Sequence, residues 1–243
     1  MPDNDDFLLP PDPEPQAETR RSFGEHMDDI RSDVVRLAGL TGEAIGACTE
    51  SLLAADLPAA ERVIRNDAKI DTFKESIEFR VYEMFATQQP MAGDLRTLLA
   101  VLRILQEIQL TADLTVTIAK ATRRLYPGQL APKVRGLVER MGAQANVQLS
   151  LAVDAFADED IETAAALPDM DDVMDDLQKD LFRAIFETTD GNEAGIQTAV
   201  QLALVGRYYE RIADHAVLIG AWTRFMVTGE FPSRAEQTDS GAP

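Results

Sequence analysis

The sequence predicts an all-α protein made of two tandem antiparallel three-helix bundles with no sheet. Apolar residues recur every three or four positions through long segments, which is the pattern of helices that bury one face. Aromatic residues make up only 6% of the chain, whereas hydrophobic residues make up 45%. The same order of segments occurs twice, which indicates an internal duplication.

The first predicted segment, residues 1–22, is a disordered acidic tail. Five prolines and six acidic residues precede the first basic residue, Arg20. Such a composition buries too little apolar surface to fold. We interpret the tail as a solubilising leader and keep a docking segment as the less favoured alternative.

Three helices are predicted for the first bundle, over residues 23–128. They span residues 23–55, 58–87 and 94–125. The first break contains Asp56 and Pro58, types that favour a helix cap and an early helical position. Proline and glycine mark the other two breaks, at Pro90, Gly93, Pro127 and Gly128.

The plan then repeats in a second bundle over residues 129–231, followed by a disordered tail at 232–243. Helices are predicted at 132–157, 161–188 and 193–228. The last helix ends where Gly229 permits a left-handed turn and Pro232 prevents continuation. Helices of about 30 residues would be about 45 Å long.

The two halves can be aligned residue by residue. Asp67 and Asp71 recur 104 positions later as Asp171 and Asp175. In the third helix of each half the offset is 101, so that Gln109 and Asp113 correspond to Glu210 and Asp214. Each half therefore carries polar pairs with a spacing of four on its second and third helices, and antiparallel packing would bring these pairs together.

Net charge limits the classes of partner. A formal charge of −19 and a pI near 4.4 argue against binding nucleic acid or bare anionic lipid. Cys48 is the single cysteine, which fits a reducing compartment. No apolar run approaches the roughly 20 residues that cross a bilayer. We expect a cytoplasmic protein that binds proteins with basic surfaces, or cations.

Like charges at a spacing of four repel, so something should compensate for Glu210 and Asp214. One explanation is local, because Arg207 and Arg211 each lie three residues before one of these acids. The other is a bound cation held together with acids of the neighbouring helix. Oxygen ligands favour Mg, Mn, Ca or Fe over Zn or Cu.

The candidate metal ligands are the acids of both halves. Gln109 replaces a carboxylate in the first half, which weakens the site there, and Glu107 lies off that face of the helix. His215 is expected to point away from the acidic face, at the helix surface. The predicted ligands are Glu210, Asp214, Asp171 and Asp175 in the second bundle, and Asp113, Asp67 and Asp71 in the first.

Four motifs stand out in the helices and at their ends: YERIADHAVLIGAW at 209–222, DLR at 94–96, NDAKIDTFKESIE at 66–78 and VTGE at 227–230. Together they resemble the PhoU family of phosphate-transport regulators. The resemblance covers about residues 23–231. It implies paired three-helix bundles that can bind metal clusters, and a regulator that restrains phosphate uptake and the phosphate-starvation response when phosphate is plentiful.

The resemblance also implies partners, namely the ATPase subunit of the phosphate ABC transporter and a phosphate-sensing histidine kinase in the membrane. The protein would thus reach the membrane only through partners, and we expect a homodimer. The residues to which we assign partner contacts are Asp94, Arg96, Arg207 and Arg211.

Non-enzymatic regulation is favoured because the chain has no P-loop, no glycine-rich phosphate cradle and no serine elbow. Two alternatives remain. A histidine phosphotransfer module would use His26 or His215. A carboxylate-bridged metallohydrolase is disfavoured, since no histidine shares the acidic face.

Overall fold

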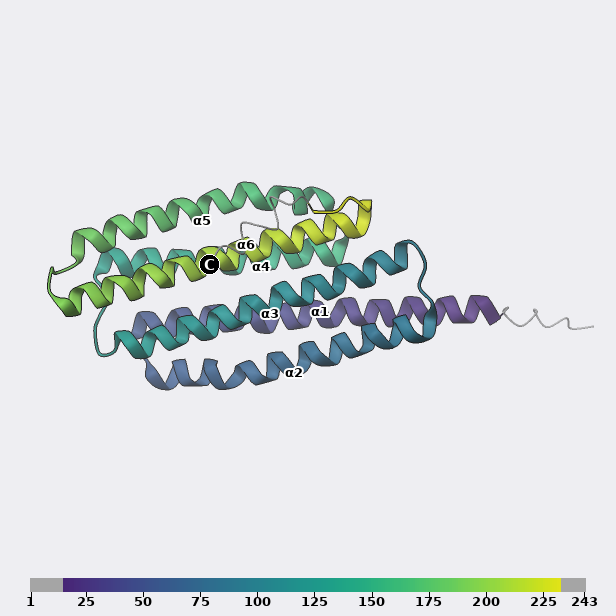
Figure 1. Ribbon diagram of the computed structural model, residues 1–243, viewed down its shortest axis with the longest axis horizontal. Coiled ribbons are helices and arrows are strands. Elements are labelled where there is room, and N and C mark those ends of the chain that lie inside the picture. The colour runs from purple at the N-terminus through teal and green to yellow at the C-terminus, as the bar shows by residue number, and fades with distance from the viewer. Residues whose placement is uncertain (1–14, 233–243) are drawn as a thin grey trace, which may run out of the picture.

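The fold is two three-helix bundles packed side by side, as Figure 1 shows for a computed structural model that describes residues 15–232, with side chains from Phe23 onward. No strand occurs among these residues, which confirms the predicted all-α class. The helices are α1 (Pro15–Ala54), α2 (Leu57–Gln88), α3 (Gly93–Leu125), α4 (Pro132–Asp158), α5 (Ile161–Thr188) and α6 (Glu193–Thr228).

The boundary of α1 differs from the prediction. The helix begins at Pro15 rather than at residue 23, so the expected disorder of residues 15–22 is wrong. Proline suits the first turn, where its missing N–H would have had no intrahelical partner. The rest of the predicted tails, residues 1–14 and 233–243, lies outside the described residues.

Equivalent caps start the second helix of each bundle. Asp56 Oδ1 accepts a hydrogen bond of 2.9 Å from the backbone N–H of Ala59 at the start of α2. Asp160 accepts from the backbone N–H groups of Glu162 and Thr163 at the start of α5. The side-chain and backbone hydrogen bonds from Thr163 lower the pKa of Asp160. Each cap satisfies N–H groups that the helix itself leaves open.

The two bundles meet along two antiparallel helix pairs, α3 with α6 and α1 with α4. Arg103 of α3 lies over the ring of Trp222 near the end of α6, while Arg124 at the end of α3 bonds to Gln201 near the start of α6. Because both central pairs are antiparallel and the halves are repeats, an approximate twofold axis relates the bundles. α2 and α5 lie on the outside.

A continuous apolar core joins the halves. Tyr209 of α6 is fully buried and its hydroxyl lies 2.7 Å from Thr49 Oγ1 of α1. Burial raises the pKa of the neighbouring Cys48 thiol to about 12, so this cysteine stays protonated near neutral pH. Among residues 15–232, no helix is both long and apolar enough to pass through a bilayer.

Close packing between α1 and α4 depends on Gly142. A Cβ at this position would lie 2.5 Å from Thr49 Oγ1 and 2.7 Å from its Cγ2. Threonine is stiff at χ1, and Thr49 is also held by Ile45 and Tyr209. The space at Gly136 on the same helix is open, with nothing within 4 Å of an added Cβ.

We predict that Gly142→Ala lowers the free energy of unfolding by about 1–3 kcal/mol through overpacking. Gly136→Ala should instead raise it by up to about 1 kcal/mol, because alanine is the better helix former. Chemical denaturation of both variants measures the difference. Equal stabilisation by the two changes would show that α1 and α4 do not pack this closely.

Candidate functional site

The first bundle brings its predicted acidic row together between α2 and α3. Gln109 of α3 donates a hydrogen bond of 2.6 Å from Nε2 to Asp71 Oδ1 of α2. A longer contact of 3.4 Å joins the same nitrogen to Asp113 Oδ1. The expectation that antiparallel packing unites these two helix faces is confirmed here.

Asp67 is the most perturbed member of this row. Partial burial raises the pKa of its carboxyl, and repulsion from Asp71 and Asp113 raises it further, while Lys120 acts in the opposite direction. Its Oδ1 atom is buried without a hydrogen bond among the described residues, as is Gln109 Oε1. The site thus concentrates negative charge that its own side chains do not fully balance.

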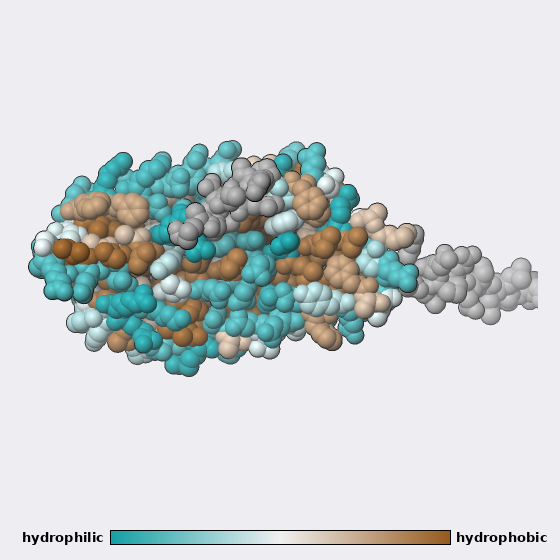
Figure 2. All heavy atoms as spheres, viewed as in Figure 1, coloured by the Kyte–Doolittle hydropathy of each residue, from teal (hydrophilic) through white to brown (hydrophobic). Residues whose placement is uncertain are grey.

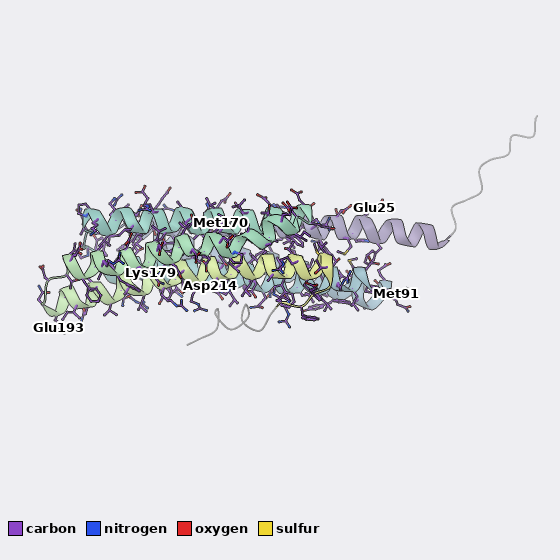
Figure 3. All side chains as sticks on the ribbon, turned by 90° about the horizontal axis from the view of Figure 1, so that it is seen from above. Glu25, Met91, Met170, Lys179, Glu193 and Asp214 are labelled. Carbon is purple, nitrogen blue, oxygen red and sulfur yellow. The ribbon has the colours of Figure 1, made fainter. Side chains whose placement is uncertain are left out.

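In the second bundle the row is divided between α5 and α6. Asp171 and Asp175 lie half-buried on α5, while Glu210 and Asp214 lie on α6, with Asp214 labelled midway along that helix in Figure 3. Glu210 is buried and its Oε1 accepts a hydrogen bond from Arg207. The charge of Glu210 is therefore balanced in part by Arg207 on the same helix, as the first of the two explanations predicted.

The donors of both rows suit a hard cation, but no three Asp, Glu, His or Cys side chains among the described residues converge into a ready-made metal site. Glu210 Oε2 is buried without a hydrogen bond in the described part of the chain. A buried acceptor left without a partner costs about 1–3 kcal/mol, which a bound cation would offset. The rows suit a hard cation because their ligand atoms are oxygens, not because the side chains already surround a common point.

One polar pair was not anticipated from the sequence. His215 is 1% exposed, and its Nδ1 lies 2.8 Å from Glu107 Oε2 of α3. The expectation that His215 is a helix-surface side chain is wrong, because it lies inside the contact between the two bundles. Its position three residues after Ile212 and four before Ile219 falls on the apolar stripe of α6, a signal that could have indicated burial.

Arg96, one of the residues assigned to partner contacts, lies beside the other bundle. Its Nη1 lies 2.5 Å from where a Cβ of residue 229 would be, so the guanidinium packs closely beside Gly229. Gly229 has a φ of 83° and ends α6. A guanidinium next to a helix C-terminus is favoured by the helix dipole, and Arg96 therefore contributes to joining α3 to α6.

The other residues assigned to partner contacts differ in their surroundings. Asp94 is exposed in the first turn of α3 and is open to a partner. Arg207 is engaged by Glu210, and Arg211 is half-buried on α6. Partner binding by any of the four residues stays a prediction.

The geometry defines the class as a duplicated helical-bundle protein with an acidic row in each repeat. A family model described as the PhoU domain matches twice, at residues 34–122 and 138–223. These stretches begin at 34 and 138 and end at 122 and 223, so the repeat offset is 104 at the start and 101 at the end. The chain belongs to the PhoU family.

Relatives match along most of the chain. The phosphate-specific transport system accessory protein PhoU homolog 1 of Mycobacterium tuberculosis is 34% identical over 218 residues, which cover 89% of this chain and 98% of that protein. The PhoU homolog of Caulobacter vibrioides is 28% identical over 212 residues, or 87% and 92% of the two chains.

Solved structures support the fold. The crystal structure of PhoU from Pseudomonas aeruginosa matches with a TM-score of 0.79 at 24% identity, covering 86% of this chain and all of that one. PhoU from Streptococcus pneumoniae gives the same TM-score at 23% identity, with 87% and 99% covered.

The raised pKa of Asp67 predicts a pH-dependent effect on stability. Since the folded-state pKa lies above the unfolded value, the charged carboxylate destabilises the fold near pH 7, and protonation relieves this as the pH falls through the folded-state value. Without metal, Asp67→Asn should raise the Tm at pH 7 by the order of 1–2 °C, a modest gain because water screens the half-exposed group.

The advantage of Asp67→Asn should shrink as the pH approaches 3.8, the ordinary value for this carboxyl. Asp172→Asn, on the exposed side of α5, serves as the control and should leave the Tm nearly unchanged. Thermal unfolding from pH 7 to pH 4 in chelator measures both. An advantage for Asp67→Asn that grows on acidification would contradict the prediction.

Proposed function

We propose that this protein is a non-enzymatic regulator of phosphate homeostasis. It restrains phosphate uptake by the phosphate-specific ABC transporter, and phosphate-starvation two-component signalling, when phosphate is plentiful. The observation that carries the proposal is the family match in both repeats, together with relatives named as phosphate-specific transport system accessory proteins over nearly their whole length.

A regulator of this kind acts by binding other proteins. The partners we propose are the ATPase subunit of the transporter and the phosphate-sensing histidine kinase, which the protein meets in the cytoplasm as a homodimer. Elongated bundles with a continuous core offer long, rigid helix faces for such contacts. The net negative charge of −19 disfavours competing binding to nucleic acid, which is itself negatively charged.

Phosphotransfer is the second candidate, and the structure weighs against one of its acceptors. His215 is buried against Glu107, so a phosphoryl donor would reach it only if the bundles separated. His26 is exposed on α1 and lines a cleft with Arg80 and Glu83. Incubation with a phosphorylated receiver domain tests this alternative, which requires acid-labile label on a histidine.

The regulatory proposal is tested in cells that lack this protein. In phosphate-rich medium the deletion should raise both phosphate uptake and expression from a phosphate-starvation promoter, and the wild-type gene should restore both. Uptake of labelled phosphate and a promoter fusion are the measurements. Unchanged uptake and unchanged expression in the deletion strain would contradict the proposal.

We also infer that the acidic rows hold a hard divalent or trivalent cation, with Mg, Mn or Fe favoured over Zn. The proposed ligands of the second bundle are Glu210, Asp214, Asp171 and Asp175, and those of the first are Asp113, Asp67 and Asp71. Four carboxylates attract such a cation more strongly than three carboxylates and an amide. When bound, the cation would balance the repulsion within each row.

Metal should accordingly stabilise the protein, since a ligand of the native state shifts unfolding by mass action. Glu210→Gln is expected to remove most of the rise in Tm with Mg or Mn, whereas Gln109→Glu should increase it. The exposed variant Asp172→Asn is the control and should respond like the wild type. Identical responses of all four proteins would mean that the rows are ordinary solvated faces.

A further inference from the structure

Two groups of large apolar side chains are exposed at equivalent places in the two bundles. The α2–α3 patch consists of Tyr82, Leu95, Leu99 and Phe231. The α5–α6 patch consists of Phe186, Ile196, Val200 and Leu204. Phe186 is 84% exposed, which is unusual for a phenylalanine in a helix. Exposed apolar groups that gather in this way mark interaction surfaces.

The repeat offsets place these patches in register. Tyr82 corresponds to Phe186 at the offset of 104, while Leu95 and Leu99 correspond to Ile196 and Val200 at the offset of 101. Exposed helix positions accept polar residues without loss of stability. Folding does not require large apolar residues at these exposed positions. Their presence at the same positions of both repeats therefore indicates that both bundles bind a partner there.

The α2–α3 patch opens into a groove of about 390 Å³ lined by Glu78, Tyr82, Leu99, Arg103 and Phe231. Phe225 at the end of α6 supports one wall, because its ring centroid lies 4.5 Å from that of Phe231. The groove can therefore hold one inserted side chain. Its apolar lining and the flanking charges suit a protein side chain.

Both patches lie on one face of the molecule. α2, α3, α5 and α6 form the face seen in Figure 1, and apolar residues gather toward both of its ends in Figure 2. Met91 at the α2–α3 corner and Glu193 at the start of α6 are labelled toward opposite ends in Figure 3, with Asp214 between them. The approximate twofold axis relates the two patches.

Acidic residues occupy the same helix faces between the patches. Asp67, Asp71, Glu78 and Tyr82 recur at spacings of four, seven and four along one side of α2, where Glu78 is paired with Lys74. The face is thus apolar at its ends and acidic toward its middle. A second copy of this chain would set acid against acid, with a formal charge of −19 on each chain. Complementarity instead requires basic residues on the partner.

We infer that this face docks a twofold-symmetric dimeric protein, each subunit of which inserts an apolar side chain flanked by Lys or Arg into one patch. One chain then binds one partner dimer. Linking two contacts in this way strengthens binding without any new type of contact. The inference rests on the proposed function only in seeking the partner among the ATPase subunit and the histidine kinase.

The test measures binding of the purified ATPase subunit, and of the dimeric cytoplasmic part of the kinase, by calorimetry. The variants are Leu99→Ser and Val200→Ser, which occupy equivalent positions, and their combination. Val147→Ser is the matched control, because Val147 is 48% exposed on α4, away from this face, against 51% for Val200. Circular dichroism verifies that all four variants melt like the wild type.

Each patch variant should weaken binding of at least one partner about tenfold, the double variant should weaken it further, and the control should stay within about twofold. Light scattering should give one chain per two partner subunits. Binding that both patch variants leave intact, binding to one partner subunit, or self-association through this face would overturn the inference. Absence of binding to either protein overturns it too, while the uptake assay judges the regulatory proposal separately.

Discussion

The contact of α3 with α6 is the interaction on which the rest of the structure depends. It joins the two repeats through the pair of Glu107 and the buried His215 at its middle and through Arg96 beside Gly229 near one end. Because the two helices run antiparallel, the contact also sets the twofold relation of the bundles. The acidic rows and the apolar patches share one face as a consequence.

Most of the fold could be predicted from the spacing of apolar residues. In the first helix, for example, Ile30, Val34, Leu37 and Ile45 recur at helical spacings and are all buried. The predicted limits of the last two helices agree with the structure. The start of α1 was missed, because a proline-rich composition suggests disorder although a single proline at Pro15 is compatible with a first helical turn.

The acidic rows could be anticipated because spacing within a helix places side chains on a face, and duplication shows which faces correspond. Contacts between the bundles could not be anticipated in this way. Glu107 and His215 are far apart in sequence, and neither spacing nor composition states which helix of one repeat packs on the other. For the same reason the sequence did not indicate that Arg96 lies beside Gly229 of the second bundle.

We infer that the working surface is the face made by α2, α3, α5 and α6, with α1 and α4 as its support. Hydrogen exchange with and without the dimeric partner tests this assignment most directly, since it reports on every helix of the unmodified protein. Slowed exchange should appear together around residues 79–99 and 183–204, with α1 and α4 unchanged. Protection confined to one bundle, or protection of α1 and α4, would contradict the inference that this face is the working surface.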